Sequence, residues 1–442
     1  MSMDMERVVF TREMKETHTI LIPMMLPIHF KMLSALFNQQ GYHTELLFND
    51  GRSVVDEGLR NVHNDTCYPA LLVIGQMLDA LASGKYDPHK VAFLITQTGG
   101  GCRASNYIHL LRKALKKSGY GYIPVISLNL AGLEKNPGFE LPPAMLMKLA
   151  YAVIVGDFLM LLSNQCRPYE ANPGDTARVV ERYCNYFAKW FAGAKLVRYK
   201  KIRAMYPEIM EAFDSIPKKS EKRAKVGVVG EIYVKYSPLG NNNLEDFLIS
   251  EGAEPVVPGL LDFCLYCVYN GIVDHELYGT AWYKNAAMRF AYRFLLKKQM
   301  DMINAVREYG VFDAPTPFAR TNELANEIIH HGVKMGEGWL LTAEMMELIE
   351  SGVNNIVCTQ PFGCLPNHIV GKGMMHAIKE KRPGANIVAI DYDPGASEVN
   401  QQNRIKLMLA NARLAEQLAE REKGKGHSPV SAKEKEKAPQ RS

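Results

Sequence analysis

The chain has 442 residues, of which 47% are hydrophobic and 22% charged. This composition excludes a disordered or fibrous protein, and the length predicts two or three globular domains. The formal net charge is +5, but residues 421–442 carry seven Lys or Arg against three Glu, so the rest of the chain is nearly neutral. A nearly neutral body lacks the basic face that nucleic-acid binding needs, and we expect no nucleic-acid partner.

The sequence also argues against export and against a membrane. The N-terminal stretch "MSMDMERVVFTREMKE" has no apolar core of the kind found in a signal peptide. The most apolar stretch, residues 144–162, is interrupted by Lys148 and Asp157, so we expect a buried helix and no membrane partner. A cytoplasmic location follows as the expectation, and in that reducing compartment the eight cysteines are core, metal or redox groups and not disulfides.

The first part of the chain alternates between strand-like and helical patterns. The expected elements are a strand at 18–25, a helix after Phe30, a strand at 43–48, a helix after Pro69, a strand at 91–97, a helix at 107–118, a strand at 122–130 and a long helix at 142–164. Alternation of this kind predicts a parallel sheet with helices on both faces.

A second series of the same kind follows a helical stretch at 172–222. Its expected elements are strands at 226–234, 253–259, 354–360 and 385–393, helices at 243–252 and 370–380, and a mostly helical stretch at 280–333. We therefore predict an α/β protein with two doubly wound parallel-sheet units, Rossmann- or flavodoxin-like, and intervening helices. The expected boundaries are 1–165 for the first unit, 166–222 for a helical linker, 223–421 for the second unit with a helical insertion, and 422–442 for a disordered basic tail.

Ligands of parallel sheets bind at the carboxyl ends of the strands, which gives a criterion for sorting the cysteines. Cys102 passes it, since it follows a predicted strand and three glycines. Cys364 also passes, because it lies in a turn just after the strand that contains Cys358, and Cys67 lies in a loop before a predicted helix. The remaining thiols sort less clearly: Cys184 and the C-x-x-C pair Cys264 and Cys267 are expected in the core, and Cys166, which follows a helix, is ambiguous.

Several kinds of site fit a cysteine after "TQTGGG". A nucleotide P-loop is disfavoured because no Gly-Lys-Ser/Thr follows the glycines. A zinc site would more naturally use paired cysteines or histidines. Three widely separated thiolates suit an iron–sulfur cluster with one open iron, and the backbone N–H groups of Gly100 and Gly101 could approach its sulfurs. A catalytic thiol with His368 or His29 as its base stays open.

Long motifs in this sequence resemble a known family. The stretches "NDTCYPALLVIGQ", "QTGGGCRASNYIHLLRKAL", "VGEIYVKYSPLGNNN", "GEGWLLTAEM" and "CTQPFGCLPNHIVGKGM" resemble the 2-hydroxyacyl-CoA dehydratase component superfamily. Over residues 10–410 the chain looks most like the C-terminal segment of large dehydratase-activator-like proteins of anaerobes. In those proteins the segment follows ATPase modules of the acetate/sugar kinase and actin fold. This sequence has no such module, so the resemblance implies a separate ATP-hydrolysing activator as a partner.

The resemblance also implies a cofactor and its ligands. It implies a [4Fe–4S] cluster in a cleft between α/β subdomains, held by Cys67, Cys102 and Cys364. Some relatives hold a sulfide-bridged double cubane, for which Cys358 and Cys166 would be the first additional ligands. Arg103 and Glu231 are candidates for groups around the cluster. Each has a structural alternative: Arg103 could form a salt bridge at a helix start, and Glu231 could cap a helix.

Two functions remain as expectations. In the first, a low-potential electron raised in energy by the activator's ATP hydrolysis drives reductive radical chemistry on an acyl-CoA-type substrate, in a dimeric enzyme. In the second, the same cluster serves a non-enzymatic electron-transfer or cluster-carrier protein that has no thioester site. A third possibility, a metal-free scaffold with buried cysteines, requires the purified protein to lack iron.

Overall fold

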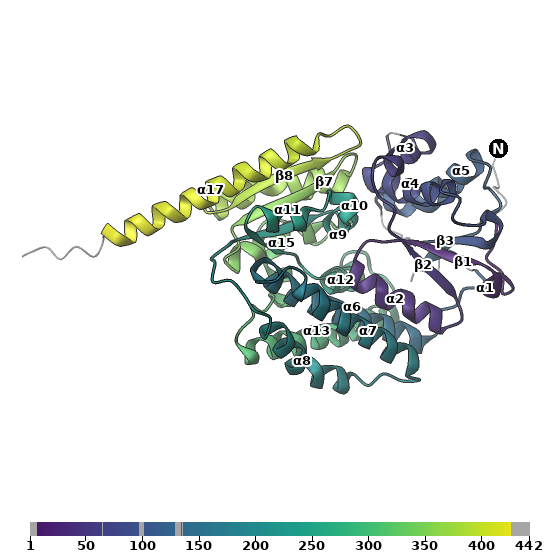
Figure 1. Ribbon diagram of the computed structural model, residues 1–442, viewed down its shortest axis with the longest axis horizontal. Helices are drawn as coiled ribbons and strands as arrows, with labels where there is room; N and C mark the ends of the chain where they lie inside the picture. Colours follow the sequence, from purple (N-terminus) through teal and green to yellow (C-terminus); the bar gives the residue numbers. More distant parts are fainter. Residues whose placement is uncertain (1–6, 64, 97–100, 129–133, 135, 426–442) are drawn as a thin grey trace, which may run out of the picture.

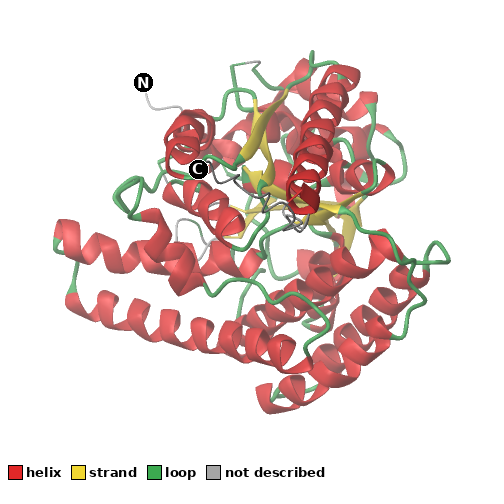
Figure 2. Cartoon of the chain, turned by 90° about the vertical axis from the view of Figure 1, so that its left-hand side faces the viewer, coloured by secondary structure: helices red, strands yellow, loops and turns green. Residues whose placement is uncertain are grey.

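The computed structural model describes residues 7–63, 65–96, 101–128, 134 and 136–425. It contains two four-stranded parallel sheets, which lie side by side with helices around them (Figure 1). Figure 2 shows the strands at the centre of the molecule and long helices below them. The predicted α/β class with two parallel sheets is confirmed.

The first sheet has the strand order β2-β1-β3-β4. Its strands are β1 (Thr19–Pro23), β2 (His43–Leu47), β3 (Val91–Thr96) and β4 (Val125–Leu128). Successive side chains of a strand point to opposite faces, so Ile20 enters one core cluster and Leu21 the other. Helices α2 (Pro27–Gln39) and α6 (Pro143–Cys166) cover the first face, and α4 (Tyr68–Ala82) and α5 (Tyr107–Lys117) cover the second. Two short helices complete this part, α1 (Met14–Thr17) and α3 (Arg52–Asn61).

Helix α6 lies at the centre of the helical layer, next to α7 (Asp175–Gly193) and α8 (Tyr199–Asp214). Among the helices of the described residues, only the run Pro143–Tyr169 is long and apolar enough to cross a membrane, and 67% of its most apolar window is buried. Its two interrupting charges are used inside the protein, because Lys148 Nζ donates to Gln39 Oε1 and Asp157 accepts three hydrogen bonds. These contacts are those of a core helix, as expected.

The second sheet repeats the topology of the first, with the order β6-β5-β7-β8. Its strands are β5 (Ala224–Gly230), β6 (Ala253–Val256), β7 (Asn355–Pro361) and β8 (Asn386–Tyr392). The helices of this part are α9 (Ile232–Tyr236), α10 (Pro238–Asn241), α11 (Leu244–Ser250), α12 (Leu260–Tyr278), α13 (Trp282–Tyr309), α14 (Phe318–Ala325), α15 (Trp339–Glu350), α16 (Met375–Lys381) and α17 (Glu398–Lys425). Both faces are again covered, since Val228 packs in a cluster with residues of α17 and Val229 in a cluster with residues of α15.

The structure corrects the predicted strand at 226–234. Strand β5 ends at Gly230, whose φ of +145° and close approach to Thr359 leave no room for a Cβ. Glu231 then caps α9, and Ile232 and Val234, which favour strands by type, are helical. Strand propensity was overridden here by a capped turn.

Two features in the second half of the chain differ from what the sequence predicted. Helix α12, which contains Cys264 and Cys267, was not predicted as an element. The tail was predicted to be disordered from residue 422, but residues 422–425 continue α17, and the rest of the predicted tail, 426–442, lies outside the described residues.

Candidate functional site

Three loops carrying cysteines meet where the two sheets face each other. Cys67 is the residue before α4, Cys102 follows β3, and Cys364 follows β7. The Tyr68 backbone N–H donates to the Phe362 carbonyl at 3.0 Å, which joins the first loop to the third. The contact explains why residues almost 300 positions apart in the sequence come together at the strand ends.

Gly363 fixes the distance between two of these loops. Its φ is +72°, and a Cβ at this position would lie 3.2 Å from the Cys67 Cα and 3.3 Å from Arg103 Nη1. A glycine is favoured there both because of the left-handed backbone and because the Cys67 backbone is so close. The turn "PFGC" therefore brings Cys364 next to Cys67 and Arg103.

A fourth segment, the loop before α15, closes the same region. Gly336 has a φ of +61°, and a Cβ there would lie 3.8 Å from the Cys102 Cβ and 3.1 Å from Pro366 Cγ. Gly101 lies against Met335, the preceding residue of this loop. The loop thus contacts both the Cys102 segment and the residues just after Cys364.

The three thiols are free, and burial holds them in the protonated form. Burial raises the pKa of Cys67 to about 11, raises that of Cys102, and raises that of Cys364 strongly. The hydroxyl of Tyr107 lies 2.7 Å from Cys67 Sγ, and its own pKa is raised by burial and by the charge of Cys67. Tyr107 therefore keeps its proton and can donate a hydrogen bond to a Cys67 thiolate.

This environment disfavours a nucleophilic thiol. A reactive cysteine needs a lowered pKa and an adjacent base, whereas the pKa values of these thiols are all raised. Among the described residues, neither of the two histidines considered as bases contacts one of these thiols through its ring, although the His368 backbone N–H donates to the Cys364 carbonyl at 3.2 Å. His29 is buried and bonds Asp157 through Nε2 at 2.8 Å, and His368 is exposed.

Two buried carboxyl groups face the thiols. Glu231 caps α9 by accepting from the Val234 N–H at 2.9 Å, and Glu337, on the loop before α15, accepts from the Ile232 N–H at 2.9 Å. Burial, reinforced by the charge of Glu337, raises the pKa of Glu231 to about 8. Burial likewise raises the pKa of Glu337, so the pair retains a proton near neutral pH.

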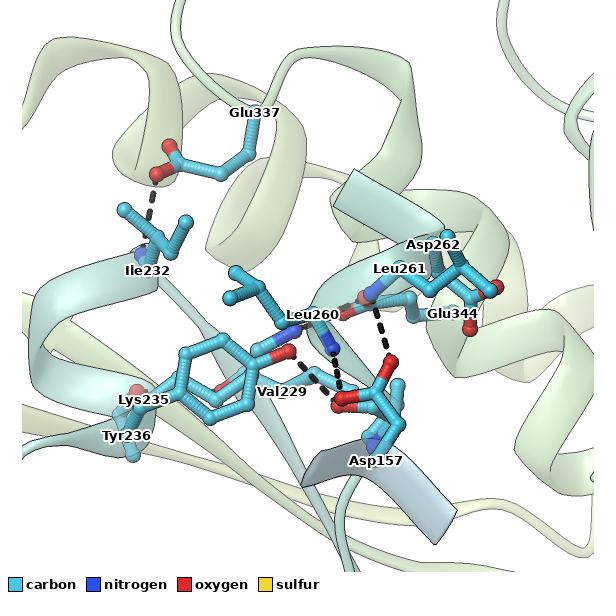
Figure 3. Close-up of polar contacts among 12 residues, drawn as sticks. Asp157, Val229, Ile232, Lys235, Tyr236, Leu260, Leu261, Asp262, Glu337 and Glu344 are labelled. Carbon is cyan, nitrogen blue, oxygen red and sulfur yellow. Dashed lines mark hydrogen bonds and ion pairs between the residues drawn. The ribbon is translucent and has the colours of Figure 1, made fainter. Parts of the chain in front are cut away.

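Behind these carboxyls lies a fully buried ion pair, shown in Figure 3. Lys235 Nζ is 2.9 and 3.2 Å from the two Glu344 carboxylate oxygens, and the side chains are 4% and 2% exposed. Figure 3 also shows Asp157, which accepts from the backbone N–H groups of Leu260 and Leu261 at 2.9 and 2.7 Å. It thereby attaches the start of α12 to the core helix α6.

The other five cysteines lie apart from these three loops, in the core or on the surface. Cys358 is buried on β7 and packs in the core cluster beside α15, and Cys166 is buried at the end of α6, 3.6 Å from the Phe213 carbonyl. Neither lies with the three loop thiols. Cys184 is in the core, as predicted. Cys264 is half-buried, but Cys267 is exposed on α12, so the prediction that both are core residues is wrong for Cys267.

The predicted residues around the thiols also differ in what they contact. Gly100 lies outside the described residues, whereas Gly101 borders Met335. Arg103 donates to the Asp65 carbonyl, and no ion pair of Arg103 is found among the described residues, so the salt-bridge alternative is not observed. Glu231 is a helix cap and also lies close enough to Cys67 to raise its pKa.

The donor set can be tested against the metal chemistry that the motifs imply. In the described part of the chain, no three His, Cys, Asp or Glu side chains are grouped so as to hold one metal ion. In a cluster each thiolate binds a different iron, so three separate thiols, two of them just after strands β3 and β7 and one just before α4, fit a cluster better than a single ion. No protein-family model and no curated protein sequence matches the chain.

Sequence reasoning missed Tyr107, Glu337 and the Lys235–Glu344 pair. All of them lie inside motifs quoted above, such as "GEGWLLTAEM", where a glutamate among apolar residues is unusual. Their roles depend on contacts between distant segments: 40 positions separate Tyr107 from Cys67, and 109 separate Lys235 from Glu344. The sequence signal was a charged residue among apolar neighbours, but this signal does not identify the distant residue that it contacts.

Proposed function

We propose that this chain is an iron–sulfur protein in which Cys67, Cys102 and Cys364 bind three irons of a [4Fe–4S] cluster. The observation that carries the proposal is the meeting of three free thiols from three loops around Gly336 and Gly363. Thiolates are the ligands that iron–sulfur clusters use, and the glycines let the backbone segments that carry these thiols approach one another closely.

The topology of the two sheets supports this position. The strand order of each sheet reverses between its first and third strands, β1 and β3 or β5 and β7, which is the order of the first four strands in a flavodoxin-like sheet. Ligands of such sheets bind at the carboxyl ends of the strands on either side of the reversal. Cys102 follows β3, Glu231 follows β5 and Cys364 follows β7, so all three occupy such positions.

The chain's own residues have distinct roles in this proposal. The Tyr107 hydroxyl donates to the Cys67 sulfur, and burial keeps water away from it. Glu231 and Glu337 hold a proton at the edge of the site, because their pKa values are raised. Cluster binding must displace the protons of the three thiols, so it should be favoured at higher pH. A bound cluster would supply low-potential electrons one at a time.

The activity we propose is reductive chemistry on an acyl-CoA-type substrate, with a separate ATP-hydrolysing activator as the electron donor. This part depends on the sequence motifs, which resemble 2-hydroxyacyl-CoA dehydratase components. The competing function, electron transfer or cluster carriage without a thioester site, uses the same thiols. Binding of a coenzyme A thioester to the cluster-loaded protein would favour the enzyme, and its absence at millimolar thioester would favour the carrier.

The test of the cluster is a direct analysis of the protein purified without oxygen. We expect a brown protein with about four irons and four sulfides per chain, or about eight irons for a double cubane. Electron paramagnetic resonance of the dithionite-reduced protein should give the signal of a reduced cluster. A folded, colourless protein that stays free of iron after anaerobic reconstitution with iron and sulfide would contradict the proposal.

A further inference from the structure

The junction between α12 and α13 places large aromatic side chains in water. Tyr278 lies at the end of α12, and Trp282, Tyr283 and Phe290 lie in the first third of α13. Their exposed fractions are 68%, 76%, 59% and 75%, in that order. We call residues 278–290 the α12–α13 tip. A group of exposed rings on a folded protein marks a site of contact with another molecule or with a membrane.

The exposure follows from how α13 packs. The second half of the helix buries Gln299, Met302, Ile303 and Val306 against the body of the protein. Every side chain of residues 286–290 is instead exposed. Successive residues of an α-helix are about 100° apart, so these five residues face all directions around the axis. The beginning of α13 therefore lies open to solvent on most of its circumference.

The same part of α13 carries uncompensated positive charge. Residues 279–300 contain five Lys or Arg and no Asp or Glu. Arg289 forms an ion pair with Glu276 at 3.0 Å. Three more cations are exposed and form no ion pair among the described residues: Lys284, Arg293 and Lys297. The surface therefore fits a partner that carries negative charge.

Rings and cations share one face of the helix. Phe290, Arg293 and Lys297 follow one another at spacings of three and four residues, which places them on the same side of α13. Aromatic rings beside Lys and Arg, without acidic residues, are typical of helices that lie in the surface of an anionic bilayer. The rings enter the headgroup region and the cations contact the lipid phosphates.

Two observations favour a lipid surface over an acidic protein. The exposed side chains of residues 286–290 face all directions, and a folded partner would cover only one of these, whereas lipids surround an inserted helix end on every side. Three of the four rings at the tip are Trp or Tyr, the aromatic types that membrane–water interfaces favour. The expectation of no membrane partner came from the interrupted apolar stretch at 144–162, and a contact at the surface needs no spanning stretch.

We propose that the α12–α13 tip attaches this protein to the surface of a bilayer that contains anionic lipids. Each Lys or Arg near an anionic surface strengthens binding about fivefold, so the three unpaired cations together contribute about 100-fold. The attachment is reversible, because it uses side chains at the surface and no spanning helix.

Co-sedimentation of the full chain with lipid vesicles tests the proposal. Wild-type protein should bind vesicles of phosphatidylcholine and phosphatidylglycerol about 100-fold more tightly than vesicles of phosphatidylcholine alone. Raising the salt concentration should weaken the binding, because salt screens the attraction between the cations and the lipids. The fluorescence of Trp282, which is 76% exposed, should shift to shorter wavelength when anionic vesicles are added, and Trp282→Phe should remove this shift.

Two double variants separate the contribution of the charges from that of the rings. Arg293→Gln with Lys297→Gln should weaken binding to the anionic vesicles by about 25-fold. Trp282→Ser with Phe290→Ser should weaken it by about 10-fold or more, because two rings no longer leave water. If the second variant fails to fold, which circular dichroism shows, Tyr283→Ser provides the same test.

Two matched controls make the same changes elsewhere on the surface. Lys113→Gln with Lys116→Gln removes two exposed cations of α5. Leu407→Ser with Leu414→Ser removes two apolar side chains that are 64% and 55% exposed on α17, far from α13 (Figure 1). Both controls should bind vesicles as the wild type does.

Three results would overturn the proposal. The first is a wild-type protein that binds anionic vesicles no better than neutral ones. The second is binding that the variants of the tip leave unchanged or that the controls weaken equally, because the contact would then lie elsewhere. The third is binding of polyglutamate but not of vesicles, weakened by Arg293→Gln with Lys297→Gln, which would identify an acidic protein as the partner.

Discussion

The buried ion pair between Lys235 and Glu344 provides a quantitative test of the site's interior. We predict that Glu344→Gln destabilises the protein strongly, because it leaves the Lys235 ammonium buried without a counter-ion. Removing one partner of a buried pair costs about 3–5 kcal/mol. Both side chains here are less than 5% exposed, which places the expected cost at the upper end of that range.

The double variant Lys235→Met with Glu344→Leu should behave differently. Burial raises the pKa of Glu344 despite the ammonium 2.9 Å away, so the cost of removing the carboxylate from water exceeds the attraction between the charges. Replacing both charges by apolar side chains of similar size should therefore cost less than about 1 kcal/mol, or even stabilise the fold. The coupling between the two sites should be several kcal/mol.

Urea unfolding followed by circular dichroism measures these differences. The control is Glu327→Gln, which removes one partner of the Arg382–Glu327 pair, whose side chains are 31% and 32% exposed. That change should cost less than about 1 kcal/mol. A loss below about 1 kcal/mol in Glu344→Gln, or a double variant as unstable as the sum of its single variants, would refute the reasoning.

Two further predictions concern pH and the loop beside Cys67. Burial raises the pKa of Glu347 from 4.5 to about 7, so between these pH values the unfolded state releases a proton that the folded state still holds. Up to about 3 kcal/mol of stability is therefore lost as the pH rises from about 4.5 to 7. Glu347→Gln should abolish this loss. The measurement is the urea unfolding midpoint at pH 5 and at pH 8, which should differ in the wild type and be more nearly equal in the variant. The same difference between the two pH values in both proteins would contradict the prediction. Gly363→Ala should lower the free energy of unfolding by about 1–2 kcal/mol, because alanine disfavours the positive φ at this position. It should also lower iron retention, because the added Cβ would lie 3.2 Å from the Cys67 Cα. Gly352→Ala, also at positive φ but with no atom within 4 Å, should cost stability and keep the iron; equal iron loss in both variants would show that the Cys67 contact is irrelevant.

The alternating parallel units could be predicted because their signals are local. Buried strands such as β3 and β7 are short apolar runs, and the helices between them begin at recognisable residues such as Pro69. The end of β5 could not be predicted in the same way. Val228, Val229, Ile232 and Val234 all favour strands, and only the capping contact of Glu231 and the close approach of Thr359 decide where the strand stops.

The candidate site could be predicted in part for a similar reason. The rule that ligands lie at the carboxyl ends of parallel strands selects Cys102 and Cys364 from sequence alone. It ranked Cys364, in the turn, above Cys358, six residues earlier, but it left Cys358 as an additional candidate because both lie near the end of one strand. The structure separates them, since the Cys358 side chain lies in the core on one face of β7, whereas Cys364 lies in the turn beyond it. Glu337 needed the contact between its loop and α9, which no local pattern contains.

The most direct test of the central claim is the iron content of two matched triple variants purified without oxygen. One replaces Cys67, Cys102 and Cys364 by Ser, and the other replaces the buried thiols Cys166, Cys184 and Cys358 by Ser. A serine hydroxyl binds iron poorly, so the first variant should contain no cluster while remaining folded. The second should be less stable but keep the wild-type iron and sulfide content. A first variant that retains the wild-type iron content, or a second that alone loses it, would contradict the assignment of the three loop thiols.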